Sequence, residues 1–271
     1  MTTQNDKTAA FRKLHESGCF ALPNPWDAGS ARYLQALGFK ALASTSAGFA
    51  WTTGRLDYQL TVDDVIDHLA ALCAASDLPV NADFEGGFAV EPEGVAANIT
   101  RAVQAGVAGL SIEDRAEPGV PFPLLETGLA VARIKAARAA IDATGTGVVL
   151  TARCEAFLVG QSDLDLVIQR LTAFAEAGAD CLYAPGLVKD ADIAAVVKAV
   201  APLPVNVLAF DYDWTTQHLA DLGVRRVSLG GALAKKAYAE AMNAAKAWLD
   251  TGALSGMGAG LPIPFPKVFG G

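Results

Sequence analysis

The sequence predicts an α/β fold, a closed (β/α)₈ barrel, on three observations. Eight short apolar runs alternate with eight longer helix-like stretches, which is the order of parallel strands joined by crossover helices. The chain has 271 residues, enough for one such barrel of about 250 residues. No linker rich in Gly, Pro or Ser divides the chain in its middle. We therefore expect a single domain, residues 1–271, with a C-terminal helix and a proline-rich tail.

The expected elements follow in order along the chain. Strands are expected at Cys19–Leu22, Ala41–Ala43, Pro79–Ala82, Ala108–Ile112, Val148–Thr151, Asp180–Tyr183, Pro204–Leu208 and Arg226–Leu229. Helices are expected at residues 27–37, 61–75, 92–105, 126–143, 163–177, 190–200, 215–222 and 231–249. Gly38, Gly106, Gly178 and Gly223 stand where a helix ends and a strand follows, a place that favours a left-handed residue. An open doubly wound sheet is the alternative, but no Gly-x-Gly-x-x-Gly fingerprint follows the first strand.

The two ends of the chain are expected to lie outside the barrel. Residues 1–10 are polar and are expected to be frayed. The tail contains Pro262, Pro264 and Pro266, so we expect no helix there. The tail either drapes over the barrel or reaches a neighbouring subunit.

Composition and charge exclude several classes of protein. Hydrophobic residues make up 52% of the chain and charged residues 18%, which excludes a disordered chain. The net charge of −8 disfavours nucleic acid and an anionic membrane surface as partners. The four cysteines are scattered, with no Cys-x-x-Cys pair, and no signal-peptide core or membrane-spanning run is present. We expect a cytoplasmic protein that binds neither nucleic acid nor membranes.

Acidic residues follow the strands, at the end of the barrel where active sites of this fold lie. Asp83 and Glu85 follow the third strand, Glu113 follows the fourth, and Asp57 belongs to the loop after the second. Carboxylates that converge in one cleft repel each other unless a cation lies among them. Oxygen ligands favour Mg²⁺, with Mn²⁺ as the second choice. The alternative is that these residues are solvated loop acids or helix caps.

Arg153 ends the fifth strand at the same mouth. A guanidinium beside a divalent cation suits a substrate carboxylate or an enolate oxygen. The alternative is an ion pair with Glu155 or Glu113 that only stabilises the rim. The turn of small residues at Thr45–Gly48 is able to aim backbone N–H groups at an anion. The long loop at residues 114–124 is either a lid over this mouth or an ordered surface loop.

A series of motifs resembles the isocitrate lyase/phosphoenolpyruvate mutase superfamily over nearly the whole chain, from about Phe11 to about Ala245. Each motif is short, but their order and spacing together are specific. They are Pro-Trp-Asp-Ala-Gly-Ser-Ala at 25–31, Ser-Thr-Ser-Ala-Gly at 44–48, Gly-Arg-Leu-Asp at 54–57, Pro-Val-Asn-Ala-Asp-Phe-Glu-Gly-Gly-Phe at 79–88, Gly-Leu-Ser-Ile-Glu-Asp at 109–114 and Thr-Ala-Arg-Cys-Glu-Ala-Phe at 151–157. Pro-Gly-Leu at 185–187 and Val-Ser-Leu-Gly-Gly at 227–231 resemble the phosphoenolpyruvate mutase-like branch.

The resemblance implies a barrel that binds Mg²⁺ and an α-oxyacid, and that breaks or forms a C–C or P–C bond next to a pyruvate enolate. It implies Asp83 as the direct metal ligand. It implies that Asp57, Glu85 and Glu113 hold metal-bound waters, and that Arg153 meets the substrate carboxylate or oxyanion.

The resemblance also implies substrate contacts and an assembly. The backbone amides of the turn formed by Thr45, Ser46, Ala47 and Gly48 would bind the substrate, and Trp26 and Asp27 would flank the pocket. The assembly would be a homotetramer in which a C-terminal helix is exchanged between subunits.

Some segments of this sequence differ from the motifs of the superfamily, and these differences narrow the range of reactions that the chain is expected to catalyse. Isocitrate and methylisocitrate lyases carry Lys-Lys/Arg-Cys-Gly-His after the Glu-Asp of strand four, with the Cys as acid or base. Here that segment is Arg-Ala-Glu-Pro-Gly-Val at 115–120, without Cys or His, which disfavours both activities. The Lys and the Asn or Thr with which mutases and phosphonopyruvate hydrolases hold a phosphonate are absent as well. Thr45 and Glu85 stand where mutases have Ser and Asp.

The function predicted best is therefore a Mg²⁺-dependent decarboxylase or carbon–carbon lyase that acts on a small α-keto or α-hydroxy dicarboxylic acid. Decarboxylation starts without a general base, whereas a retro-aldol lyase needs one, for which Glu117 is the candidate. Cys154 is interpreted as a buried bystander. The candidate catalytic residues are Arg153, Thr45, Ser46 and Glu117. The alternatives are phosphonopyruvate hydrolase or phosphoenolpyruvate mutase activity, a non-catalytic metabolite-binding barrel, and a hydroxymethyltransferase of the ketopantoate-forming kind.

Overall fold

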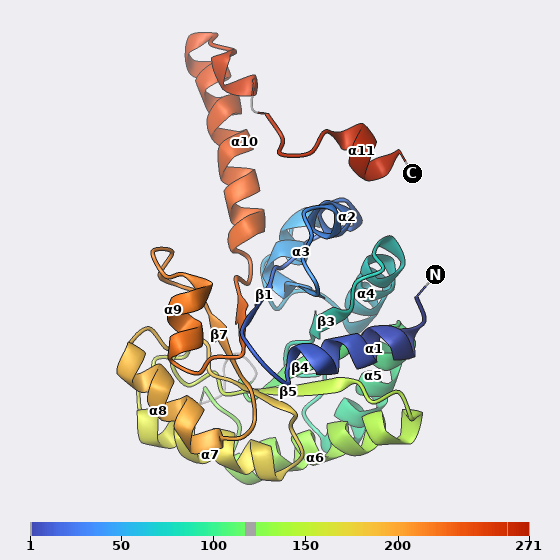
Figure 1. The fold of residues 1–271 in the computed structure, drawn as a ribbon, viewed down its shortest axis with the longest axis vertical. Helices are drawn as coiled ribbons and strands as arrows, with labels where there is room; N and C mark the ends of the chain where they lie inside the picture. The colour runs from blue at the N-terminus through green and yellow to red at the C-terminus, as the bar shows by residue number, and fades with distance from the viewer. Residues whose placement is uncertain (1, 117–122, 259, 271) are drawn as a thin grey trace.

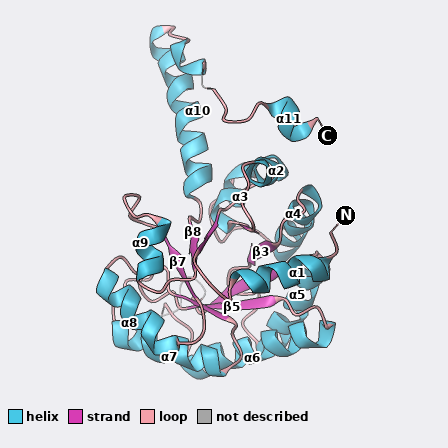
Figure 2. Cartoon of the chain, viewed as in Figure 1, coloured by secondary structure: helices cyan, strands magenta, loops and turns pink. Residues whose placement is uncertain are grey.

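In the computed structural model, which describes residues 2–116, 123–258 and 260–270, eight parallel strands lie inside a ring of helices (Figures 1 and 2). The strands are β1 (Phe20–Leu22), β2 (Leu42–Ala43), β3 (Val80–Asp83), β4 (Gly109–Glu113), β5 (Val149–Arg153), β6 (Cys181–Tyr183), β7 (Val205–Leu208) and β8 (Arg226–Ser228). The helices are α1 (Gln4–Leu14), α2 (Ala28–Ala36), α3 (Ser46–Thr52), α4 (Val62–Ala75), α5 (Pro92–Gln104), α6 (Thr127–Thr144), α7 (Leu164–Glu176), α8 (Asp190–Val200), α9 (Thr216–Asp221), α10 (Ala232–Thr251) and α11 (Phe265–Phe269), with a 3₁₀ turn at Ser255–Met257.

The sheet runs in the order β1-β8-β7-β6-β5-β4-β3-β2, and single hydrogen bonds close it between β1 and β2. The backbone N–H of Ala43 donates to Pro23 O at 3.0 Å. The Asn24 side chain donates to Ser44 O at 3.0 Å and accepts from Leu229 N at 2.9 Å, so it joins the ends of three strands. The predicted (β/α)₈ barrel is confirmed.

The predicted helix ends are confirmed at four glycines. Gly38, Gly106, Gly178 and Gly223 have φ of +95°, +98°, +102° and +87°, a region that costs glycine little and other residues more. Between these helices and the sheet lies a core of fully buried Ile, Leu, Val and Phe side chains.

Three strands run further than their apolar runs predicted, and their last residues are charged. β3 ends on Asp83, β4 on Glu113 and β5 on Arg153. The strand register pairs Asp83 with Ser111, and Glu113 with Arg153. The predicted strands stop before these charged residues, whereas strand pairing continues to the mouth of the barrel, so the charged residues are held by the sheet itself.

The expectation of a frayed N-terminus, residues 1–10, is wrong. Gln4–Leu14 form α1, which begins at a capping box between Thr3 and Asp6. Phe11 on this helix is fully buried, in a cluster with apolar side chains of β1, β2 and β5. The burial of Phe11 holds the helix on the barrel. The polar composition of residues 1–10 gives no sign of this contact.

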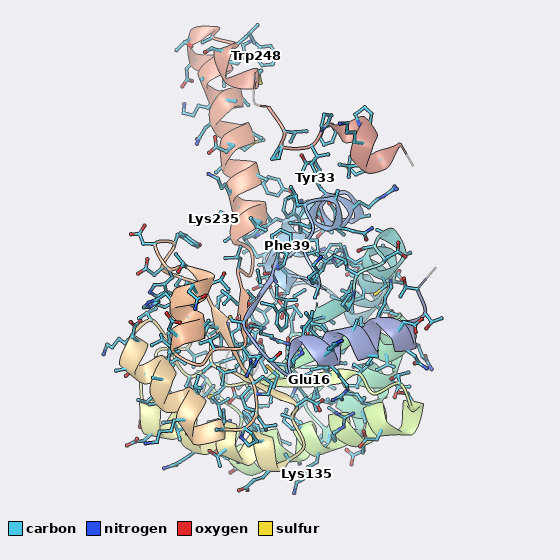
Figure 3. The ribbon with its side chains drawn as sticks, in the orientation of Figure 1. Glu16, Tyr33, Phe39, Lys135, Lys235 and Trp248 are labelled. Carbon is cyan, nitrogen blue, oxygen red and sulfur yellow. The ribbon has the colours of Figure 1, made fainter. Side chains whose placement is uncertain are left out.

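The expectation of a non-helical tail is also wrong. Phe265–Phe269 form α11, and Pro266 is compatible with this helix because it stands in the first turn, where no N–H is needed. The tail returns to α2 of the same chain, where the Tyr33 hydroxyl donates to Ile263 O at 2.7 Å (Figure 3). α10 stands away from the barrel and carries Trp248 near its far end (Figures 1 and 3). In the described part of the chain, no helix is both long enough and apolar enough to span a membrane.

Replacing Phe11 with Ala tests whether α1 is part of the barrel. We expect a loss of about 3–5 kcal/mol in the free energy of unfolding, because the change removes a fully buried ring and leaves a cavity. Urea titration measures it. The matched change at Phe210, which is 45% exposed, should cost less than about 1 kcal/mol. A loss at Phe11 as small as the loss at Phe210 would show that Phe11 does not hold α1 against the barrel.

The buried imidazole of His68 should make stability depend on pH. His68 stacks on Phe49 with ring centroids 3.8 Å apart, and burial lowers its pKa to about 4 from its ordinary 6.5. The unfolded chain therefore binds a proton between pH 6.5 and about 4 that the folded chain refuses, so stability falls as the pH falls through this window. The His68→Leu variant should lose less unfolding free energy than the wild type between pH 7 and pH 4.5, by up to about 3 kcal/mol. If urea titrations show the same loss of unfolding free energy between pH 7 and pH 4.5 in the wild type and the variant, His68 is not the source of the pH dependence.

Candidate active site

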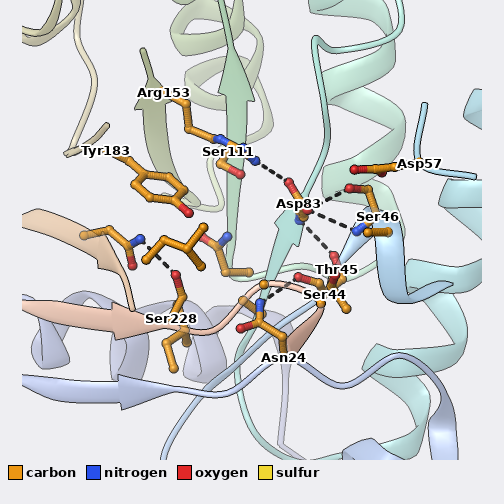
Figure 4. A pocket seen from close by; sticks show the side chains of 18 of the residues that line it. Asn24, Ser44, Thr45, Ser46, Asp57, Asp83, Ser111, Arg153, Tyr183 and Ser228 are labelled. Atoms are coloured by element: carbon orange, nitrogen blue, oxygen red, sulfur yellow. Dashed lines mark hydrogen bonds and ion pairs between the residues drawn. The ribbon is translucent and has the colours of Figure 1, made fainter. Parts of the chain in front are cut away.

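A cavity of about 210 Å³ opens at the carboxyl ends of the strands (Figure 4). Its charged lining consists of Asp57, Asp83, Arg115, Arg153 and Arg226. Serine, asparagine and tyrosine side chains supply much of the remaining polar wall. No lysine, cysteine or histidine is among the described residues that line it.

Asp83 lies at the centre of the site (Figure 4). Ser46 donates to its Oδ2 through both the backbone N and Oγ, each at 3.0 Å. Arg153 Nη1 donates to its Oδ1 at 2.7 Å. Ser44 Oγ accepts from the Asp83 backbone N at 2.8 Å, so β2 and β3 are tied together at this point.

Arg153 is held by three carboxylates. Besides Asp83, it pairs with Glu113 at 3.2 Å and with Glu155 at 2.9 Å, and its guanidinium lies 5.0 Å from the centre of the Tyr183 ring. Burial opposes the charge of Arg153, but the three carboxylates outweigh burial and hold its pKa above its ordinary value. Burial raises the pKa of Glu113 and of Glu155. The ion pairs that the sequence offered as an alternative therefore exist, and they coexist with the contact to Asp83.

The carboxylates next to Asp83 meet the chemical needs of a hard divalent cation. Burial, followed by repulsion from Asp83, raises the pKa of Asp57 and raises the pKa of Glu85 to about 8. Asp57 Oδ1 and Glu85 Oε1 are buried with no hydrogen-bond partner in the described part of the chain. Oxygens of this kind are the donors that Mg²⁺ takes. Glu113 differs from them, because Tyr58 and Arg153 occupy its two oxygens.

These carboxylates do not form a closed metal cage. Among residues 2–116, 123–258 and 260–270, no group of three or more His, Cys, Asp and Glu side chains is arranged to hold an ion by itself. An ion next to Asp83 would therefore need oxygens of water or substrate for most of its ligands.

The turn expected at Thr45–Gly48 is the beginning of a helix. Thr45 caps α3, and its Oγ1 accepts from Gly48 N at 3.2 Å. Ser46 N is used by Asp83, as described above. Thr45, Ser46 and Ala47 line the cavity, and Gly48 is buried behind them.

Trp26 and Asp27 contribute to helix α2 and its contact with α3. Asp27 is exposed and caps α2, where its carboxylate accepts from Ser30 N at 2.6 Å. Trp26 is half-buried against α3, beside Gly48. Neither Trp26 nor Asp27 is among the residues that line the cavity.

The segment at residues 114–124 is closed at its base. Ala116 N donates to Pro123 O at 3.0 Å, and Leu125 N donates to Asp114 O at 2.8 Å. Glu117, a predicted catalytic residue, lies outside the described residues.

Cys154 is fully buried. Burial, followed by the charge of Asp114, raises the pKa of its thiol. It lies outside the cavity wall, which supports its interpretation as a bystander.

Sequence reasoning missed Tyr58 and gave Arg115 no role. The Tyr58 hydroxyl donates to Glu113 Oε1 at 2.7 Å, and the Arg115 guanidinium lies 4.4 Å from the centre of the Tyr58 ring. Only their positions in the sequence could have indicated a role in the site, since Tyr58 directly follows Asp57 and Arg115 lies two residues after Glu113.

A polar chain at the floor of the cavity was missed as well. Arg226 donates to Asn206 Oδ1 at 2.9 Å, and Asn206 donates to Ser228 Oγ at 3.0 Å. All three side chains are buried and line the cavity, although their strands read as apolar runs.

A second buried ion pair supports the site from behind. Asp114 accepts from Arg170 Nε at 2.7 Å and from Glu155 N at 2.8 Å, and all three residues are buried. Arg170 also donates to Thr127 Oγ1 and Leu125 O, each at 2.9 Å. This network fixes the backbone that carries the Glu155 partner of Arg153.

The chain is similar to several known proteins in sequence and in structure. A sequence model of the phosphoenolpyruvate phosphomutase family matches residues 11–249. An oxaloacetate decarboxylase of Pseudomonas aeruginosa is 31% identical over 245 residues, which cover 85% of this chain and 81% of that protein. A solved structure from Burkholderia cenocepacia J2315, named as a candidate lyase/mutase, is 44% identical with a TM-score of 0.93 and covers 98% of this chain and 95% of that one. Oxaloacetate acetylhydrolase in complex with oxalate is 26% identical with a TM-score of 0.86, covering 98% of this chain and 93% of that one.

Replacing Arg170 with Met tests the support behind the site. We expect a loss of about 3–5 kcal/mol in unfolding free energy, because the change leaves Asp114 buried without its cation. Chemical unfolding followed by circular dichroism measures it. The exposed Lys246–Asp250 pair offers the matched control, and Lys246→Met should cost less than about 1 kcal/mol. A similar small cost at Arg170 would exclude a supporting role for the buried pair.

Proposed function

We propose that this chain, which belongs to the phosphoenolpyruvate phosphomutase family, is a Mg²⁺-dependent decarboxylase or carbon–carbon lyase. Membership makes it a carbon–carbon lyase-type enzyme of the isocitrate lyase/phosphoenolpyruvate mutase superfamily, which acts on small carboxylic acids. The substrate that we propose is a small α-keto or α-hydroxy dicarboxylic acid, and the reaction passes through a pyruvate-type enolate.

The observation that carries this proposal is the contact between Arg153 and Asp83 in the wall of a small cavity. A guanidinium is a fixed, permanent cation with directed N–H donors. Held by three carboxylates, Arg153 cannot turn away from the cavity, so it is preorganised to stabilise negative charge on a substrate oxygen.

Asp83 would hold the Mg²⁺ ion, with Asp57, Glu85 and Glu113 around its water shell. The unpartnered oxygens of Asp57 and Glu85 support this assignment. When bound, the ion supplies a Lewis acid that polarises the keto oxygen of the substrate.

The residues of the chain account for the remaining steps. Arg153 binds the head of the α-keto acid and stabilises the oxyanion that forms as CO₂ leaves. Ser46 keeps the Asp83 carboxylate fixed by its two hydrogen bonds. A decarboxylation begins without proton removal, so this step needs no general base. Water supplies the proton that converts the enolate to pyruvate.

Homotetrameric assembly and cytoplasmic location are also proposed. α10 stands off the barrel with only Ala234 buried, and it exposes the large apolar side chains of Tyr238, Met242, Trp248 and Leu249. Contact between subunits would cover these side chains. Four free cysteines support a reducing compartment.

Pyruvate release, coupled to lactate dehydrogenase, tests the proposal. The substrates are oxaloacetate, methylisocitrate, a dimethylmalate and phosphonopyruvate, each with and without Mg²⁺. We expect Mg²⁺-dependent pyruvate from a carbon acid, after subtraction of the metal-catalysed loss of oxaloacetate in free solution. Asp83→Ala should lower kcat about 100-fold or more, because it removes the group that orders both Arg153 and the ion.

The exposed acid Asp63 provides the control, since Asp63→Ala should leave the rate unchanged. Pyruvate from phosphonopyruvate alone would favour phosphonate chemistry instead. No turnover, in a protein that Mg²⁺ and oxalate still stabilise against heat, would favour a binding protein without catalysis.

A further inference from the structure

The reaction cavity carries one positive charge that no role above uses. Three guanidinium groups line it, from Arg115, Arg153 and Arg226, against the two carboxylates of Asp57 and Asp83. Arg153 is held by three carboxylates, and Arg226 is bonded to side chains at the floor. Arg115 is therefore the guanidinium that remains to be explained.

Arg115 is fixed at the rim of the cavity by backbone and ring contacts. It lies two residues beyond β4, where it forms an antiparallel bridge with Leu124. Its guanidinium lies 4.4 Å from the centre of the Tyr58 ring. No described carboxylate lies within ion-pair distance of it. A guanidinium that has no carboxylate partner keeps N–H donors available, and its planar fork matches a carboxylate in bidentate geometry.

Tyr58 sets the position of Arg115 relative to Arg153. Its hydroxyl donates to Glu113 Oε1 at 2.7 Å, while Glu113 Oε2 lies 3.2 Å from Arg153. One carboxylate therefore anchors both cations, Arg153 directly and Arg115 through the Tyr58 ring. With φ of +63°, Tyr58 adopts a backbone conformation that costs energy outside glycine, so its position is imposed by its surroundings.

We propose that Arg115 binds the second carboxylate of a dicarboxylic acid and thereby selects dicarboxylic over monocarboxylic substrates. The inference rests on the proposed function, in which Arg153 takes the α-oxyacid head. Both guanidinium groups line one cavity of about 210 Å³, so a small acid whose head meets Arg153 has Arg115 in the same cavity for its far carboxylate. Tyr58 is the positioning residue for this contact.

Binding of two α-hydroxy acids, malate and lactate, tests the proposal without turnover. They share the same head and differ by the second carboxylate. Isothermal titration calorimetry in the presence of Mg²⁺ should show that the wild type binds malate about tenfold or more tightly than lactate. Arg115→Met should weaken malate binding about 10- to 100-fold and change lactate binding less than about threefold. Arg115→Lys should fall between the wild type and Arg115→Met, because it keeps the charge and loses the planar edge.

The control is Arg101→Met, since Arg101 pairs with the exposed Asp63 on the helical surface, and it should preserve both affinities. A wild type that binds malate no better than lactate would overturn the proposal. So would an Arg115→Met variant that weakens both acids alike or neither. Pyruvate release is measured separately, so an enzyme that fails the pyruvate assay but shows Arg115-dependent malate preference contradicts the proposed reaction and supports the role of Arg115.

Discussion

The ion pairs of Arg153 are the interaction on which the geometry of the site depends. The arginine ends β5, and its partners Asp83 and Glu113 end β3 and β4, so one side chain ties three strands together at the mouth of the barrel. Burying each of these charges costs several kcal/mol, which only the complete set of partners offsets. A displaced strand would leave a buried charge unpaired, and this penalty holds the three strand ends in register.

Closure of the barrel depends on a similar use of polar groups. β1 and β2 share single hydrogen bonds rather than a regular ladder, and the Asn24 side chain joins β1 to β2 and to β8. On the adjoining strands β8 and β7, Ser228 and Asn206 continue the polar lining down to Arg226. An apolar interior would fill this space with packed side chains, as in the layered core of an ordinary barrel. The polar interior instead leaves a cavity above a hydrogen-bonded floor.

The sequence predicts the fold and the centre of the site because both depend on local patterns and one geometric rule. Alternating apolar runs and amphipathic stretches predict the strands and helices, and the carboxyl ends of parallel strands must meet at one mouth, which brings Asp83, Glu113 and Arg153 together. Tyr58 and Phe11 follow no such rule. The role of Tyr58 depends on a contact with Glu113, 55 positions away, and that of Phe11 on burial against strands that the local sequence does not identify.

Three residues beside this site adopt a strained backbone conformation. Tyr58, Glu85 and Phe88 are the described non-glycine residues with positive φ, and all three line a second cavity of about 320 Å³ beside the first. Each such conformation costs about 1–3 kcal/mol. Arg133 restrains this region by donating to Gly86 O and Ala89 O. Glycine would adopt these backbone conformations at little cost. At positions 58 and 85 the strained backbone carries a hydroxyl that donates to Glu113 and an unpartnered carboxylate oxygen beside Asp83.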